Sequence, residues 1–114
     1  MRYDLEERTL IFAKKIIGLC RTLSKNTVNF ELVKQLVRAG SSIGANYREA
    51  NGAASKKDFN NKIRISLKEA KETHYWLQLV IEANDEFQKR MEPLLQESLE
   101  LIKIFSSIIG KLKG

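Results

Sequence analysis

Few residues of this 114-residue chain could perform acid–base or nucleophilic chemistry. It has one histidine, His74, and one cysteine, Cys20. His74 shares a helical face with Ile63 and Leu77, which indicates a core histidine rather than a general base. Cys20 falls on the apolar face of the first predicted helix, and no adjacent residue would activate its thiol.

Metal and cofactor chemistry finds equally little support. A zinc site needs several His or Cys ligands, and the chain has only one of each. Glu69, Glu72 and His74 do not form the Glu-x-x-His pairs of a di-iron helical bundle. We therefore expect no catalytic residues, no metal site and no cofactor, and predict that the protein is not an enzyme.

The segment Gly40-Ser-Ser-Ile-Gly44 invites comparison with a phosphate-binding loop. Such a loop requires a preceding strand and a Lys directly after its second glycine, and both are missing here. The two glycines are four residues apart and lie on the inward face of a predicted helix. Their spacing predicts close backbone approach to a neighbouring helix, which offsets a cost of about 1 kcal/mol each in helix propensity.

Positive charge is concentrated in the first two-thirds of the chain. The net charge is +6, yet residues 8–71 hold 14 Lys and Arg against four Asp and Glu. Residues 72–114 hold five against seven. This distribution favours a surface that faces a polyanion, although a solvated helix coat has the same composition.

One face of the third predicted helix carries the most specific basic pattern. Six residues fall within about 80° of one another on a helix of 3.6 residues per turn and extend over about 27 Å. A row of cations on a rigid helix can follow phosphates, and tyrosine or asparagine can contact sugars or bases. We call this set the basic ridge and predict that it binds nucleic acid: Lys57, Asn61, Arg64, Lys68, Lys71 and Tyr75. Lys68 could instead pair with Glu72 at i, i+4.

A polar stripe follows the second predicted helix, away from its apolar face. We expect it to form a hydrogen-bonded and ionic network with the third helix, in which Glu49 is a partner of Arg38. The members are Arg38, Ser42, Asn46 and Glu49 on the second helix and Glu69, Glu72 and Thr73 on the third.

Apolar residues at 3.6-residue spacing predict four helices and no strand. The first follows a cap at Asp4 and runs to about residue 23, and the second covers residues 29–51. Gly52 ends the second helix, because glycine tolerates the left-handed conformation. The third spans residues 56–83 after a Ser55–Asp58 cap. The fourth begins near Pro93, or residues 86–92 form an extra turn that is kinked there.

Inward faces follow from this spacing. The first helix presents Leu5, Thr9, Phe12, Ile16, Leu19, Cys20 and Leu23, and the second Phe30, Val33, Leu36, Val37, Gly40, Ile43, Gly44 and Tyr47. The third presents Phe59, Ile63, Leu67, Ala70, His74, Leu77 and Ile81, and the fourth Leu95, Leu99, Ile102, Phe105, Ile109 and Leu112. Four such helices joined by short loops predict a single domain, residues 1–114, with an all-α, antiparallel up-down four-helix bundle.

Some apolar residues fall outside these faces, and large apolar patches usually mark interfaces. We therefore expect a homo-oligomer. The candidate interface residues are Ile65, Trp76, Leu79, Leu101 and Ile108.

The motifs resemble a known family. The block R-A-G-S-S-I-G-A-N-Y-R-E-A, followed by A-S-K-K-D-F-N-N-K-I and S-L-K-E-A-K-E-T-H-Y-W-L, is similar to the bacterial 23S rRNA intervening-sequence proteins, also called the four helix bundle protein family. The likeness covers nearly the whole chain. Matching positions are Arg38, Ser42, Asn46, Arg48, Glu49, Asp58, Lys68, Glu69, Glu72 and Thr73.

The resemblance implies an antiparallel bundle that assembles into a ring, often a pentamer, with no firmly assigned activity. It also implies an origin in reading frames inserted in 23S rRNA genes, and related retroelement accessory proteins bind nucleic acid and a reverse transcriptase. Two hypotheses remain: an oligomeric RNA- or DNA-binding protein, or a structural assembly module that binds a protein partner. The acidic, non-apolar N-terminus and the lack of a long apolar run predict a cytoplasmic protein without membrane contact.

Overall fold

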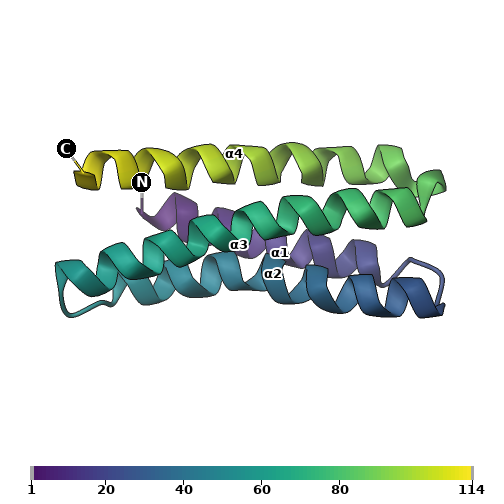
Figure 1. The fold of residues 1–114 in the computed structure, drawn as a ribbon, viewed down its shortest axis with the longest axis horizontal. Helices are drawn as coiled ribbons and strands as arrows, with labels where there is room; N and C mark the ends of the chain where they lie inside the picture. The colour runs from purple at the N-terminus through teal and green to yellow at the C-terminus, as the bar shows by residue number, and fades with distance from the viewer. Residues whose placement is uncertain (1, 114) are drawn as a thin grey trace.

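The computed structural model describes the backbone of residues 2–113 and the side chains of residues 5–112. Four long helices run side by side along a rod of 44 × 20 × 20 Å (Figure 1). They are α1 (Arg2–Cys20), α2 (Thr27–Asn51), α3 (Lys56–Ala83) and α4 (Gln88–Lys113), and a 3₁₀ turn η1 (Asp85–Phe87) precedes α4. Successive helices are antiparallel, which confirms the predicted all-α up-down bundle.

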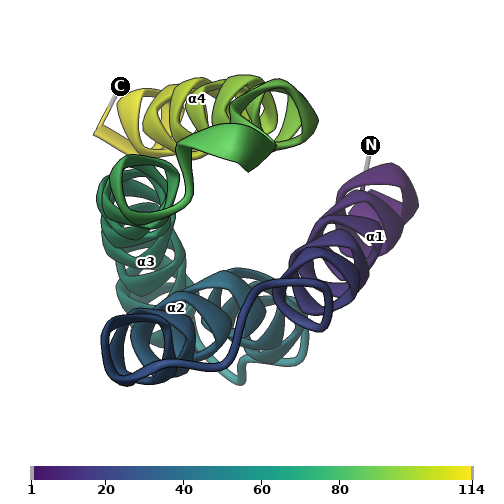
Figure 2. The same cartoon turned by 90° about the vertical axis from the view of Figure 1, so that its right-hand side faces the viewer.

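The helices are not evenly packed. Figure 2 shows α1, α2, α3 and α4 at four corners in chain order, with α1 and α3 diagonally opposed. The pairing of α2 with α3 is the most extensive, and that of α4 with α1 is the weakest. The bundle is therefore built on a tight α2–α3 hairpin.

The predicted inward faces of α1 and α3 are largely confirmed. Leu5, Thr9, Phe12, Ile16 and Leu19 are buried on α1. On α3, Ile63, Ala70 and Leu77 are fully buried, and His74 is half-buried beside them. These residues form one core with α2 and α4.

Three inward assignments are wrong. Phe30 is 69% exposed, because it lies near the start of α2, where it lines an open hollow next to the end of α1. On α4, Leu99 and Leu112 are each 39% exposed, whereas the buried stripe consists of Met91, Leu94, Ser98, Leu101, Phe105 and Ile109. The apolar arc of α4 is so wide that its sequence fits several rotations about the helix axis, and only packing on α3 selects one.

The caps of α2 and α3 follow the expected chemistry. Asn29 N–H donates to the side chain of Asn26 at 2.9 Å, so α2 begins at Thr27. Asp58 N–H donates to Ser55 Oγ at 3.1 Å, which confirms the predicted cap of α3. An N-cap side chain accepts one of the backbone donors that a helix start leaves without partners.

Two predicted helix starts and the conformation of one predicted cap need correction. Helix α1 begins at Arg2, so Asp4 lies within it rather than capping it. Gly52 does end α2, but at φ −98°, and no residue of the described chain has a positive φ. Pro93 does not begin α4, because the helix starts at Gln88 and continues through the proline. Residues 86–92 are helical, as the alternative proposed, and 88–92 belong to α4 itself.

The glycines of α2 bring α1 close, as predicted. A Cβ added at Gly40 would lie 2.5 Å from Ile16 Cδ1, and one added at Gly44 would lie 2.7 Å from Thr9 Oγ1. Gly40-Ser-Ser-Ile-Gly44 lies entirely within α2, so it is a packing surface rather than a phosphate loop.

Candidate nucleic-acid interface

All six residues of the basic ridge are exposed on α3. Their face points away from the core stripe of Ile63, Ala70 and Leu77, so the cations reach solvent from a helix whose other side is fixed in the core. Because α3 pairs with both α2 and α4, this ridge has little freedom to bend.

Among the side chains of residues 5–112, no carboxylate forms an ion pair with a ridge cation. The ion pairs among the described side chains involve Arg8, Arg38, Lys62 and Lys103, and none of these belongs to the ridge. The alternative pairing of Lys68 with Glu72 is wrong, because Glu72 accepts from Arg38 at 2.7 Å instead. Lys57, Arg64, Lys68 and Lys71 therefore offer four uncompensated positive charges along one line.

Tyr75 closes the ridge at its C-terminal end. Its side chain is 55% exposed, and its ring packs edge-on against Trp76 with 5.2 Å between centroids and 72° between planes. Trp76 is itself half-buried and packs on the core.

The predicted polar network forms in part. Arg38 of α2 donates to Glu69 at 3.1 Å and to Glu72 at 2.7 Å, both on α3. The hydrogen bond to Glu72 is the main cause of a raised pKa for Arg38, opposed by desolvation and supported by Glu69. Glu69 is buried at 7% exposure, so Arg38 neutralises a carboxylate that water barely reaches.

The remaining members of the stripe bind elsewhere. Glu49 pairs with Lys62 at 2.7 Å, so the expected Arg38–Glu49 contact is wrong. Ser42, Asn46 and Thr73 each donate to a carbonyl of their own helix. The network is thus two separate α2–α3 ion-pair groups, and its role in the structure is to join the hairpin.

The single histidine and the single cysteine, His74 on α3 and Cys20 on α1, are both half-buried. His74 Nδ1 is 3.0 Å from Ser98 Oγ across the α3–α4 contact. Burial raises the pKa of Cys20 to about 11, so its thiol stays protonated near neutral pH. Within the described residues no cluster of three His, Cys, Asp or Glu could hold a metal ion.

Comparison with known proteins places this fold. The profile of a family described as 23S rRNA-intervening sequence protein matches residues 3–107. The chain belongs to this family. A crystal structure from Bacteroides thetaiotaomicron, titled as a protein of unknown function from the S23 ribosomal protein family, is 41% identical with a TM-score of 0.81. The alignment covers 91% of this chain and 96% of that one. No curated protein matches significantly.

Neither description names an enzymatic activity. For this member of the intervening-sequence family, none of the helices within residues 2–113 is long and apolar enough to cross a membrane.

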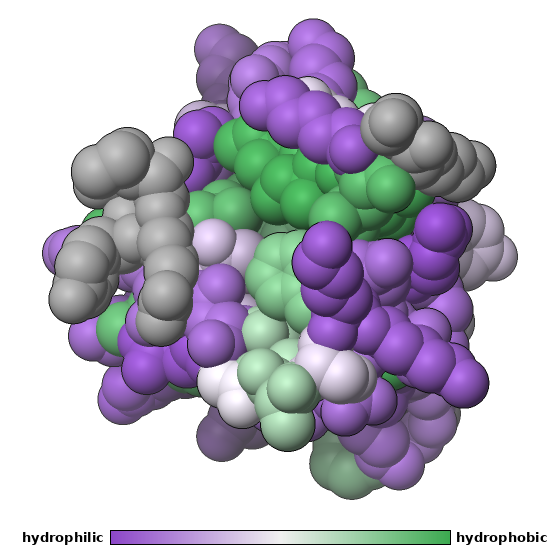
Figure 3. Space-filling view, turned by 90° about the vertical axis from the view of Figure 1, so that its left-hand side faces the viewer, coloured by the Kyte–Doolittle hydropathy of each residue, from purple (hydrophilic) through white to green (hydrophobic). Residues whose placement is uncertain are grey.

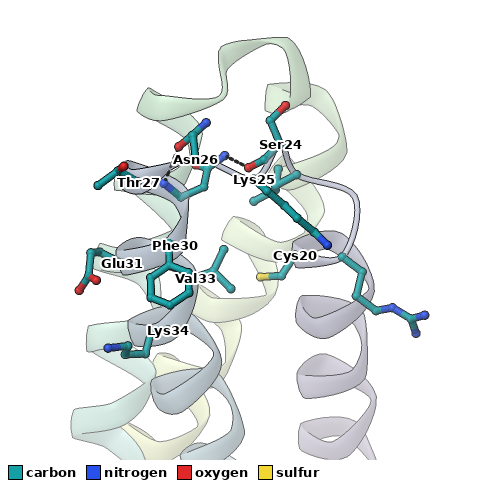
Figure 4. A pocket seen from close by; sticks show the side chains of 12 residues that line it. Cys20, Ser24, Lys25, Asn26, Thr27, Phe30, Glu31, Val33 and Lys34 are labelled. Atoms are coloured by element: carbon teal, nitrogen blue, oxygen red, sulfur yellow. Dashed lines mark hydrogen bonds between the residues drawn. The ribbon is translucent and has the colours of Figure 1, made fainter.

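Two hollows of this family member were not predicted. The larger, about 850 Å³, lies where α1 ends and α2 begins and is lined by Cys20, Phe30 and Val33; Figure 4 shows Cys20 and Val33 pointing into the space between the two helices. The smaller, about 450 Å³, lies between α1 and α4 and includes Arg8, which donates twice to Glu97, at 2.6 and 2.8 Å. The larger was missed because we assigned Phe30 to the core. The smaller hollow was missed because helical periodicity does not indicate how far apart α1 and α4 lie.

Four of the five predicted interface residues keep some exposed surface: Ile65, Trp76, Leu79 and Ile108 are half-buried. Leu101 is fully buried in the chain's own core, so that assignment is wrong. Figure 3 shows an apolar area on the end of the molecule where α4 finishes, at the level of that helix. Exposed Leu10 and Ile17 on α1 add to the apolar surface elsewhere.

Proposed function

We propose that this protein is a non-enzymatic, self-assembling bundle that binds the phosphate backbone of RNA or DNA through the basic ridge of α3. The observation that carries the proposal is the line of four exposed cations that form no ion pair with any carboxylate in the described part of the chain. Each would release a condensed counterion on contacting a phosphate, which makes backbone binding favourable at low salt.

The pairing of charges elsewhere supports this choice of face. Two carboxylates of α3, Glu69 and Glu72, are turned toward α2, where they hold Arg38. The α2–α3 ion pairs among the described side chains therefore involve none of the ridge cations. A merely solvated coat would be expected to mix both signs of charge on the same face.

Assembly would multiply the field of the ridge. We propose a homo-oligomer, with a ring of five favoured, because exposed Leu10, Ile17 and the half-buried Ile65 and Trp76 form more apolar surface than one bundle covers. Five copies at +6 each would carry +30 in total. Light scattering in solution should give a multiple of the 13.1 kDa chain mass, and a monomer mass would exclude assembly.

The direct test of the ridge is charge reversal. The variant Arg64→Glu/Lys71→Glu should keep its helicity and assembly but bind RNA weaker by a factor on the order of 100, from two lost charge-assisted contacts. The matched control is Lys14→Glu/Arg21→Glu. These exposed cations have the same seven-residue spacing, but Lys14 lies on α1 and Arg21 directly follows that helix. Helix α1 is diagonal to α3 in the bundle.

Two outcomes separate the hypotheses. Loss of RNA affinity in the α3 variant alone supports the proposal. Equal binding by the parent and both variants removes the ridge from RNA binding and favours a structural module that binds a protein partner.

A further inference from the structure

The basic ridge has a defined end. Lys71 is one helical turn before Tyr75, and the next exposed residues on this face are Gln78 and the acidic Glu82. A phosphate backbone that follows the cations from Lys57 would therefore meet an aromatic ring and then a negative charge. The ring lies where the favourable electrostatic field stops.

The Tyr75 ring is held rather than free. Trp76 contacts its ring at 5.2 Å between centroids in an edge-on arrangement, and Trp76 packs against the core. Edge-to-face packing on one partner covers at most one face of a ring, so Tyr75, which is 55% exposed, keeps a face available to another ring. A preformed ring loses little conformational freedom on stacking.

The charge next to the ring is also favourable to nucleic acid. The nearest carboxylate one turn before Tyr75, on Glu72, is occupied by Arg38 at 2.7 Å. Lys71 stands about 6 Å before Tyr75 along the helix axis, at 1.5 Å per residue. That separation suits a nucleotide whose phosphate contacts Lys71 while its base lies on the tyrosine.

We propose that the ligand of the basic ridge is single-stranded nucleic acid, with one unpaired base stacked on Tyr75. This inference rests on the proposed function and narrows its ligand class. In a duplex both faces of each internal base are covered by neighbouring bases, so only an unpaired or terminal base can reach the ring. Stacking on an aromatic side chain tolerates any base, so binding should show little sequence preference.

The test compares a short single-stranded RNA with a blunt hairpin duplex of equal phosphate number, whose loop is a flexible linker without bases. Tyr75→Leu should weaken binding of the single strand by about 5- to 150-fold, the range for loss of one base–aromatic stack, and leave the hairpin nearly unchanged. Tyr75→Phe keeps the ring and should bind like the parent. Phe30→Leu, which removes an exposed aromatic on α2 away from the ridge, is the matched control and should have no effect.

A second readout reports stacking itself. Trp76 is the only tryptophan, so its fluorescence should change when a single strand with bases binds, and should stay constant with an abasic strand of the same length. An abasic strand should also bind the parent and Tyr75→Leu equally.

The outcomes keep the two proposals apart. If Arg64→Glu/Lys71→Glu loses affinity but Tyr75→Leu binds the single strand like the parent, the stacking inference is overturned and backbone binding stands. If Tyr75→Leu weakens the single strand and the hairpin equally, base stacking is likewise overturned. If the parent binds neither RNA at low salt, both proposals fail.

Discussion

Arg38 joins α2 to α3 through two ion pairs, with Glu69 and Glu72. It is 46% exposed itself but contacts Glu69, whose side chain is 9% exposed. Removing an arginine from such a pair leaves a carboxylate that is both charged and poorly hydrated. The outer pair of Lys62 with Glu49 is different, because Glu49 is 58% exposed and water replaces its partner easily.

We therefore predict that Arg38→Ala lowers the free energy of unfolding by about 1–3 kcal/mol, the cost of an unsatisfied buried acceptor. Glu49→Ala should cost at most about 0.5 kcal/mol, as exposed ion pairs do. Arg48→Ala, exposed on the same helix and outside the ion pairs, is the control. Urea denaturation measures all three, and an equal loss for Arg38 and Glu49 would contradict this account.

A buried amide pair fixes the other end of the bundle. Asn29 and Asn84 are each 3% exposed and donate to each other's side-chain oxygen at 2.9 and 2.8 Å. Asn84 also donates to the Val80 carbonyl, and Asn29 to the Ser24 carbonyl. This arrangement joins the α1–α2 loop to the end of α3 and sets the relative position of the two connections.

Asn84→Ala should cost about 1–3 kcal/mol in stability, because the Asn29 side-chain oxygen loses its donor. Asn29→Ala should cost a similar amount, and the double variant should cost clearly less than the two losses added together. Asn46→Ala serves as a control, since its amide donates only to a carbonyl of its own helix. Strictly additive losses in thermal unfolding would show that the two amides do not act as a pair.

At the scale of the helices, one pair of glycines brings α1 and α2 together. The Cβ that alanine would add at Gly44 lies 3.1 Å from Thr9 Cβ, and Thr9 is held by hydrogen bonds to Leu5 and Glu6 carbonyls. Gly18, also within a helix, has no atom within 4 Å of its added Cβ.

Replacing Gly18 and Gly44 by alanine should change the stability of the protein in opposite directions. Gly18→Ala should raise stability by about 0.5–1 kcal/mol through helix propensity alone. Gly44→Ala gains the same propensity but must push Thr9 aside, and overpacking of about 1–3 kcal/mol makes the net effect a loss. Thermal unfolding of both variants measures the difference, and an equal gain at both positions would mean that α1 can move away freely.

Periodicity and caps predicted the elements well, since local signals determine them. Ser55 and Asp58 lie three residues apart, and Leu5, Phe12, Ile16 and Leu19 recur at helical spacing on the face of α1 that is buried. Helix α4 was less predictable because apolar residues occupy most of its circumference. There, the burial of Leu101 and the exposure of Leu99 depend on where α3 lies.

The partners of polar residues were less predictable than the helices. The sequence places Arg38, Glu69 and Glu72 on facing helices, but which carboxylate is in reach depends on the rotation of α3 against α2. Glu49 consequently pairs with Lys62, which no sequence spacing indicates. The Asn29–Asn84 pair joins residues 55 positions apart and leaves no local pattern.

At the scale of the whole molecule, charge is arranged by helix. α3 carries a row of cations that form no ion pair among the described side chains, while two of its acids, Glu69 and Glu72, pair with Arg38 of α2. The row occupies a corner of the bundle diagonal to α1, so a polyanion could lie along it without contacting the apolar groove where α1 meets α2 (Figure 2).

The salt dependence of RNA binding tests the phosphate-binding ridge most directly. If Lys57, Arg64, Lys68 and Lys71 each contact one phosphate of a single strand, log affinity against log salt concentration should have a slope of about −3 per chain. Arg64→Glu/Lys71→Glu should reduce the steepness of that slope by at least about 1.4, the share of two contacts. The same slope in the parent and this variant, or a slope near zero in the parent, would contradict the account.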